Sequence, residues 1–339
     1  MKVLLTWQAT PAEIGAFAAA LPPDALIVAQ PPGPSFSRFD CSLESIAPDL
    51  EDSEVIAGWV LPEGALARAR NLKLLIWMHA GCDELDFPTL KSRGVSVTNI
   101  RGANAVSVAE HAIALLLGVA KRLPQAREAV LASRISPYYV QGQHSALLEG
   151  RTVGLVGLGQ IGTAIAKRLR AFDMRVIATR RHPERPSEHV DAVYPRGALL
   201  EMLGFSDYVI LATPLTRETD GLFGRVELAA MKPGAFLVNI ARGNLVQEAA
   251  LAEALESGRL MGYGTDVWWF YANAYPASYH FPVPSRTGIH TQPNVLGTGG
   301  QASNAVGVVE RCIVKAIESV SDFVHHRPLR WRIDLNLEY

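Results

Sequence analysis

Short apolar runs alternate along the first third of the chain with longer segments whose apolar residues recur at helical spacing. Strands are predicted at residues 2–6, 55–59, 72–78 and 94–99, with helices at residues 11–21 and 63–71. Strands that alternate with helices pair in parallel, because each helix returns the chain to the same end of the sheet. The pattern therefore predicts one α/β unit over residues 1 to about 100.

The same alternation continues after a long apolar helix predicted at residues 104–123. This helix has few charges on any face, so it is either buried within one subunit or shared across a dimer interface. Residues 268–294 are rich in Tyr, Pro and Ser without a clear period, and form either a long ordered loop or an insertion. The other predicted elements are strands at residues 151–156, 174–179, 208–212, 235–240 and 262–267, and helices at residues 163–172 and 301–324.

A glycine-rich segment follows directly after the predicted strand 151–156 and opens the next helix. Gly157 allows a tight turn, Gly159 lets the backbone approach a pyrophosphate, and Gly162 lets helix and strand pack closely. The first turn of the helix offers free N–H groups and a positive dipole end to the phosphates. The segment Gly157-Leu158-Gly159-Gln160-Ile161-Gly162 therefore predicts a dinucleotide-binding Rossmann domain, against the alternative of a glycine-rich turn without a ligand.

The end of the following strand is expected to select the cofactor. An acidic residue there would bind the ribose 2′-hydroxyl of NAD, but the sequence has Ala178-Thr179-Arg180-Arg181. No acid repels a 2′-phosphate, and two guanidinium groups are available to bind it. NADP is therefore the predicted cofactor, with NAD as the alternative if Arg180 and Arg181 are only solvated surface charges.

Polar side chains follow two later strands and are candidates for substrate chemistry. Arg242 could hold a carboxylate through two parallel hydrogen bonds, or form a structural ion pair. Asp266 could accept a hydrogen bond from a nicotinamide amide, or cap a helix. His290 lies in the irregular segment near the predicted cleft, whereas His111, on the apolar helix, is interpreted as a hydrogen-bonded core residue. Cys82 has no evident basic partner and is interpreted as a small buried residue.

Composition narrows the class of protein. With 339 residues, 49% hydrophobic and 19% charged, the chain is expected to fold as two soluble domains. A formal net charge of −1 gives no reason to expect nucleic acid or a membrane as a partner. The three cysteines, Cys41, Cys82 and Cys312, form no CxxC pair, so neither a disulfide framework nor a metal site is predicted, and a reducing cytoplasm is the expected compartment.

Several motifs in this order resemble the D-isomer-specific 2-hydroxyacid dehydrogenases, the family that includes formate dehydrogenase, phosphoglycerate dehydrogenase and glyoxylate or hydroxypyruvate reductases. The resemblance extends from about Leu74 to the C-terminal helix. The motifs that carry it are Ala80-Gly81-Cys82-Asp83, Asn104 with Ser107-Val108-Ala109-Glu110-His111, Val156-Gly157-Leu158-Gly159-Gln160-Ile161-Gly162, Thr213-Pro214-Leu215-Thr216, Met231-Lys232-Pro233-Gly234 and Val238-Asn239-Ile240-Ala241-Arg242-Gly243.

The resemblance implies an α/β protein with two Rossmann-like lobes, each a doubly wound and mostly parallel sheet. Residues 1–100 and 297–339 would form the substrate domain and residues 101–296 the dinucleotide-binding domain, with a homodimer through the 104–123 helix. The backbone of Ala80, Gly81 and Cys82 would hold a substrate carboxylate with Asn104 nearby, and Arg242 would polarise the substrate. The cofactor contacts expected from the motifs and the resemblance together are Val108, Gly157, Gly159, Gln160, Ile161, Gly162, Thr179, Arg180, Arg181, Thr213, Pro214, Ile240, Ala241, Arg242 and Asp266.

Two positions depart from the family pattern. The family pairs a catalytic His with an acid or Gln five residues beyond the strand-end Asp, where this chain has Tyr271. The His itself normally follows Pro-Asn-Val in a Thr-Pro-His segment, and the alignment places Gly300 there. A positioned general acid contributes about 10²–10⁴-fold to such a reduction, and glycine has no proton to give. Tyr271 and His290 are the proposed substitutes.

These features predict an NADP-dependent oxidoreductase that moves a hydride between nicotinamide and a small 2-oxo or 2-hydroxy acid. The alternatives are a cofactor-binding family member without turnover, acting as a sensor or assembly partner, and a different redox reaction on the same fold. The sequence fixes neither the substrate nor the direction of the reaction.

Overall fold

The computed structural model of the chain describes residues 1–33, 37–134, 144–274 and 279–339, and for residues 271–274 and 279–283 only the course of the backbone. Two compact units make up the chain. Unit 1 comprises Met1–Asn104, Ala272–Phe281 and Val306–Tyr339, and unit 2 comprises Ala105–Tyr271 and Pro282–Ala305. Among the described residues, no helix combines the length and the apolar composition needed to span a bilayer.

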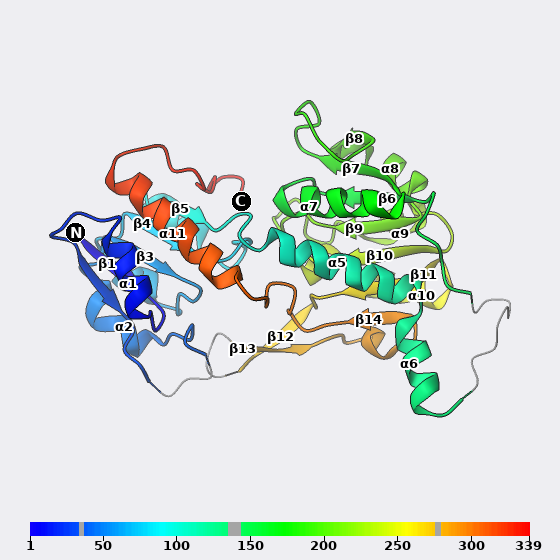
Figure 1. Cartoon of the computed structure of the whole chain (residues 1–339), viewed down its shortest axis with the longest axis horizontal. Helices are drawn as coiled ribbons and strands as arrows, with labels where there is room; N and C mark the ends of the chain where they lie inside the picture. Colours follow the sequence, from blue (N-terminus) through cyan, green and yellow to red (C-terminus); the bar gives the residue numbers. More distant parts are fainter. Residues whose placement is uncertain (34–36, 135–143, 275–278) are drawn as a thin grey trace. The chain divides into compact units, whose positions relative to one another are not determined.

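Unit 1 is a five-stranded parallel sheet with helices on both faces (Figure 1). Its strand order, β2-β1-β3-β4-β5, is doubly wound. Successive strands are added first on one side of β1 and then on the other, so the strand order reverses between β1 and β3. The strands are β1 (Lys2–Leu5), β2 (Leu26–Ala29), β3 (Val55–Gly58), β4 (Leu74–Trp77) and β5 (Ser96–Asn99), and the helices are α1 (Pro11–Ala18), α2 (Leu43–Leu50), α3 (Ala65–Arg68), α4 (Phe87–Ser92) and α11 (Val308–Val324).

Alternating side chains of these strands supply two separate cores. Val3 and Leu5 of β1 join a cluster with α1 and α11, whereas Leu4 between them joins a cluster with α2 and α4 on the opposite face. Val3, Leu4 and Leu5 are all buried, which is why β1 is apolar at three consecutive positions rather than at every second one.

Unit 2 is a seven-stranded parallel sheet of order β14-β11-β10-β9-β6-β7-β8. Read from β8, this is the Rossmann order 3-2-1-4-5-6 with one further strand. The strand order reverses between β6 and β9. The strands are β6 (Thr152–Val156), β7 (Arg175–Arg180), β8 (Ala192–Pro195), β9 (Tyr208–Leu211), β10 (Ala235–Asn239), β11 (Leu260–Thr265) and β14 (Val295–Gly297). The α-helices are α5 (Ala105–Ala120), α6 (Leu123–Leu131), α7 (Gln160–Leu169), α8 (Leu199–Phe205), α9 (Arg225–Ala230) and α10 (Glu248–Glu256).

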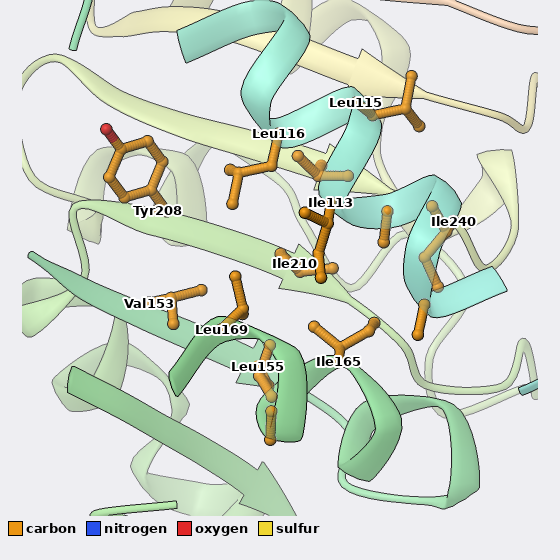
Figure 2. Packing of buried hydrophobic residues seen from close by; sticks show 14 of the residues in the cluster. Ile113, Leu115, Leu116, Val153, Leu155, Ile165, Leu169, Tyr208, Ile210 and Ile240 are labelled. Atoms are coloured by element: carbon orange, nitrogen blue, oxygen red, sulfur yellow. The ribbon is translucent and has the colours of Figure 1, made fainter. Parts of the chain in front are cut away.

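Helices α5 and α7 cover one face of this sheet, and α8, α9 and α10 lie over the other (Figure 1). Figure 2 shows the side chains that fill the first layer: Ile113, Leu116, Ile165 and Leu169 from the helices, and Val153, Leu155 and Ile210 from the strands. Packing against α7 and the strands of its own subunit accounts for the apolar composition of α5, so the dimer interface stays a prediction.

The expected fold class, two lobes with mostly parallel sheets, is confirmed. Two local predictions were wrong. The last helix begins at Val308, because Gly307 has a φ of 82° that a right-handed helix cannot continue. The helix predicted at residues 63–71 is only α3, since Gly64 is left-handed and Ala69 leaves the helical region. The segment 268–294, expected to be an ordered loop or an insertion, contains a two-stranded sheet of β12 (Phe270–Ala274) and β13 (Tyr279–Val283).

Candidate functional site

The glycine loop joins β6 to α7, at the point where the strand order of the unit 2 sheet reverses. Gly157 has a φ of 102°, and a Cβ there would lie 2.6 Å from the carbonyl oxygen of Ala212. A Cβ on Gly162 would collide with the carbonyl of Gly157. A Cβ on Gly159, in contrast, would meet nothing within 4 Å. Gly157 and Gly162 are therefore required by the protein's own packing, whereas Gly159 leaves open space before the first turn of α7.

Basic side chains gather at the ends of β7 and β8, beside this loop. The Nε and Nη2 atoms of Arg180 are buried and have no hydrogen-bond partner among the described residues. Arg181 donates to Glu218 over 3.0 Å, and Arg196 donates to the same carboxylate and, over 2.9 Å, to its backbone carbonyl. The hydrogen bond from Arg196 holds the pKa of Glu218 below its usual value. Glu218 thus pairs with Arg181 and Arg196, and Arg180 has no carboxylate partner among the described residues.

Arg196 was missed by the sequence analysis. It follows directly after β8, a half-exposed edge strand without a strong apolar run. The pairing of Arg180 with Pro195 places Arg196 at the same end of the sheet. The short segment Ala192–Pro195 could have been recognised in the sequence as the next strand after β7, which would have placed Arg196 at the end of a strand.

Arg242 occupies a turn directly after β10, and a buried amide fixes that turn. Asn239 accepts from the backbone N–H of Ala241 over 3.1 Å and donates to the carbonyl of Arg242 over 2.8 Å. A Cβ on Gly243 would collide with the backbone of Trp268, so only glycine fits there. Arg242 is half-buried, at the carboxyl end of the sheet where ligands of such folds bind.

Asp266 follows β11, is 3% exposed and anchors the loop after β14. Its Oδ1 accepts from the Thr298 hydroxyl over 2.6 Å and from the N–H of Gln301 over 2.8 Å. Its Oδ2 accepts from the N–H of Ala302 over 2.8 Å. Both oxygens of the carboxylate therefore already accept hydrogen bonds, and these bonds hold residues 298–302 in place.

His111 joins the same network from helix α5. Its Nε2 lies 2.9 Å from the Thr298 hydroxyl oxygen and 3.4 Å from Oδ1 of Asp266. Since that hydroxyl donates to Asp266, it accepts from Nε2, which therefore carries a hydrogen. The imidazole side chain is 22% exposed. His111 is thus hydrogen-bonded, as expected, and it also has a carboxylate neighbour and partial exposure to solvent.

Gly300, the residue expected at the family's histidine position, lies beside open space. Gly300 has a φ of 74°, and a Cβ there would meet nothing within 4 Å. Its N–H donates to the carbonyl of Asp266 over 2.9 Å. His290 is exposed, with its ring 6.3 Å from the ring of Trp268. The side chain of Tyr271 lies outside the described residues.

The candidate substrate loop of unit 1 follows β4. The indole N–H of Trp77 donates to the carbonyl of Gly81 over 2.9 Å, and the amide of Asn99 donates to the carbonyl of Ala80 over 3.0 Å. Cys82 is buried, and its thiol donates to the carbonyl of Glu338 over 3.2 Å. These bonds fix the course of the loop at the carboxyl end of the sheet. Asn104 is half-buried immediately before α5.

The remaining expected cofactor residues lie along the same end of the unit 2 sheet. Thr213 and Pro214 come directly after β9, and Ile240 and Ala241 directly after β10. Val108 is buried in the first turns of α5. Among the residues that the structure describes, no three His, Cys, Asp or Glu side chains form a group that could hold a metal ion.

The family can be assigned from the sequence of unit 2. A sequence model described as D-isomer specific 2-hydroxyacid dehydrogenase, NAD binding domain, matches residues 113–299. The chain belongs to the D-isomer-specific 2-hydroxyacid dehydrogenase family. It is 33% identical to hydroxypyruvate reductase of Thermotoga maritima over 78% of this chain and 84% of that protein.

Two further family members bear on the comparison. D-3-phosphoglycerate dehydrogenase of Archaeoglobus fulgidus is 34% identical over 71% of this chain, but the match spans only 44% of that longer relative. A solved D-isomer specific 2-hydroxyacid dehydrogenase from Xanthobacter autotrophicus, in complex with NADPH and MES, is 28% identical, with a TM-score of 0.77 over 100% of this chain and 99% of that one.

Proposed function

We propose that this family member is an NADP-dependent oxidoreductase that transfers a hydride between nicotinamide and a small 2-oxo or 2-hydroxy acid. The observation that carries the proposal is Arg180 beside the glycine loop, where two of its buried nitrogens find no partner in the described part of the chain. A buried donor left unpaired costs about 1–3 kcal/mol, and more when charged. A 2′-phosphate would supply the missing acceptor. NADPH in the Xanthobacter relative supports the same choice.

The residues of unit 2 fit this cofactor. The open space at Gly159 and the first amides of α7 suit a pyrophosphate, and Arg180, Arg181 and Arg196 suit the adenosine phosphate. When bound, the nicotinamide accepts or donates the hydride. The proposed contacts nearer the ring are Val108, Thr213, Pro214, Ile240, Ala241 and Asp266.

The proposed task of Arg242 is to bind the substrate carboxylate and polarise the reacting carbonyl. Asn239 holds the backbone of the turn that carries Arg242, so the turn need not be ordered when a substrate binds. Unit 1 contributes Ala80, Gly81, Cys82 and Asn104 as proposed substrate contacts. The loop of residues 80–82 is held by hydrogen bonds from the Trp77 and Asn99 side chains to its backbone carbonyls.

The proton of the reduction needs a donor other than Gly300. His290 and Tyr271 stay candidates, and His111 now joins them as our preferred one. A histidine held against a carboxylate is the usual acid–base unit of enzymes, and His111 combines the Asp266 partner with partial exposure. In the reducing direction its imidazolium would give one proton to the substrate oxygen and recover one from solvent.

The direct test is coenzyme oxidation by the full chain. NADPH or NADH is mixed with glyoxylate, hydroxypyruvate, pyruvate and phenylpyruvate, and absorbance at the nicotinamide band is followed. We expect turnover with NADPH and weaker turnover with NADH. Tight NADPH binding without turnover of any acid would favour a cofactor-binding protein instead, and turnover only with NADH would refute the cofactor assignment.

A homodimer and a cytoplasmic location remain proposals. Large apolar side chains exposed on α6, namely Leu123, Val130 and Leu131, support association next to the 104–123 helix. Cys41, Cys82 and Cys312 are buried thiols that form no disulfide, which suits a reducing compartment. Sedimentation of the native chain and of Val130→Lys would test the dimer, because a buried lysine at an apolar interface would dissociate it.

A further inference from the structure

The reversal point of unit 1 lies between β1 and β3, and ligands of doubly wound sheets bind at such points beyond the carboxyl ends of the strands. Trp7 comes shortly after β1, and Trp59 directly after β3. The chain following β3 is tied to the end of β1, since the Thr6 hydroxyl donates to the carbonyl of Val60 over 2.9 Å. Both strand ends are therefore held together at this point.

Aromatic rings form the surface there. Trp7 is fully buried, and Trp59 packs edge-on against it with ring centroids 5.3 Å apart. Phe39 lies against Trp59 with centroids 4.3 Å apart. Trp59 and Phe39 are only half-buried, so they present apolar surface above a rigid base. These two residues are called the aromatic wall below.

The aromatic wall adjoins the candidate carboxylate loop. Trp59, Phe39 and Ala80 are all partly buried against the same core cluster, on the face of the sheet covered by α1 and α11. His79, directly before Ala80, bonds through Nε2 to the carbonyl of Trp59 over 2.8 Å. Strands β3 and β4 are neighbours, about 4.8 Å apart. A molecule held by the loop after β4 would therefore lie within reach of the side chains that follow β3.

Among the described residues around the wall, we find no surplus cation for a phosphorylated side chain. Arg38 donates both terminal nitrogens to Glu13, over 2.9 and 2.8 Å, while its guanidinium lies 4.5 Å from the Phe39 ring centre. Burial alone would raise the pKa of Glu13, but the hydrogen bonds from Arg38, the Thr10 N–H and the Trp7 indole together outweigh burial, and the pKa is lowered. Asp40, 2% exposed, adds a further acid. Arg101 follows β5, on the other side of β4 from Trp59.

We propose that the aromatic wall binds the side chain of the substrate, so that the preferred substrates are 2-oxo acids with an aromatic or branched apolar side chain. This inference rests on the proposed function, and it separates this chain from relatives named for glyoxylate, hydroxypyruvate or phosphoglycerate. Glyoxylate has no side chain to bury, and a phosphorylated one would be desolvated without a cation.

The test compares kcat/KM of the full chain with NADPH for phenylpyruvate, 4-methyl-2-oxopentanoate, glyoxylate and 3-phosphohydroxypyruvate. We expect both apolar acids to exceed glyoxylate by at least about tenfold, the discrimination typical of a filled apolar pocket. Trp59→Ala should lower the ratio of phenylpyruvate to glyoxylate by at least about tenfold, and Trp59→Phe should restore most of it.

Trp331→Ala is the matched control, because it removes another half-buried indole of unit 1 that packs under Lys315 of α11. It should leave the substrate ratio unchanged even if it lowers the melting temperature. Glyoxylate or the phosphorylated acid as the best substrate, or an unchanged ratio in Trp59→Ala, overturns this inference while the proposed function stands. Absence of turnover with every 2-oxo acid overturns both.

Discussion

Replacing Arg180 by alanine should weaken NADPH binding and leave NADH binding almost unchanged. The two orphaned nitrogens of Arg180 can each donate to a 2′-phosphate, and a hydrogen bond to a charged group is worth about 1.5–3 kcal/mol. Two such bonds at the lower value give about 3 kcal/mol, which is about a hundredfold in Kd. NADH has a hydroxyl in place of the phosphate and loses neither bond.

Calorimetric titration of the native chain and the variant with both coenzymes measures this difference. Arg181→Ala is the matched control: its Nη2 already donates to Glu218, so we expect a loss smaller than about tenfold. Without coenzyme, Arg180→Ala should melt no lower than the native chain, because it removes a buried donor that lacks a partner. Equal NADPH affinities, or an equal loss for NADH, would refute the reasoning.

Three further predictions follow from the geometry. Gly159→Ala should abolish coenzyme binding without lowering the melting temperature, whereas Gly162→Ala should cost about 1–3 kcal/mol of folding stability through its clash with backbone; the reverse pattern in melting curves would contradict this. His111→Gln keeps a donor toward Thr298 but should lower kcat at least about 10²-fold and flatten its pH profile; a native profile would eliminate His111 as the acid. Asp322→Asn should lower the free energy of unfolding in urea by about 2 kcal/mol at pH 7. The Arg330 hydrogen bond lowers the pKa of Asp322, so this contribution is present above the unfolded value of 3.8 and is lost as pH falls through the folded pKa; a pH-independent difference would rule it out.

Some features of this chain are encoded by neighbouring residues, and others only by contacts between distant ones. The glycine loop was predicted because three glycines within six residues are typical of a tight turn between a strand and a helix. The helix boundary at Val308 was missed because Gly307 acts through its backbone conformation. The edge strands β2 and β8 gave no strong apolar run, since their side chains are only partly buried.

The two parallel sheets, the dinucleotide loop and the family could be inferred from the sequence, because buried strands and tight turns leave patterns over a few neighbouring residues. Which polar groups come into contact became known from the folded structure. His111 and Asp266 are far apart in the chain, and so are Arg181 and Arg196 from Glu218. The orphaned nitrogens of Arg180 and the aromatic wall at Trp59 likewise depend on which strand ends are neighbours in the folded sheets. No periodicity encodes such a contact, because strand order is set by the packing of whole elements rather than by adjacent residues.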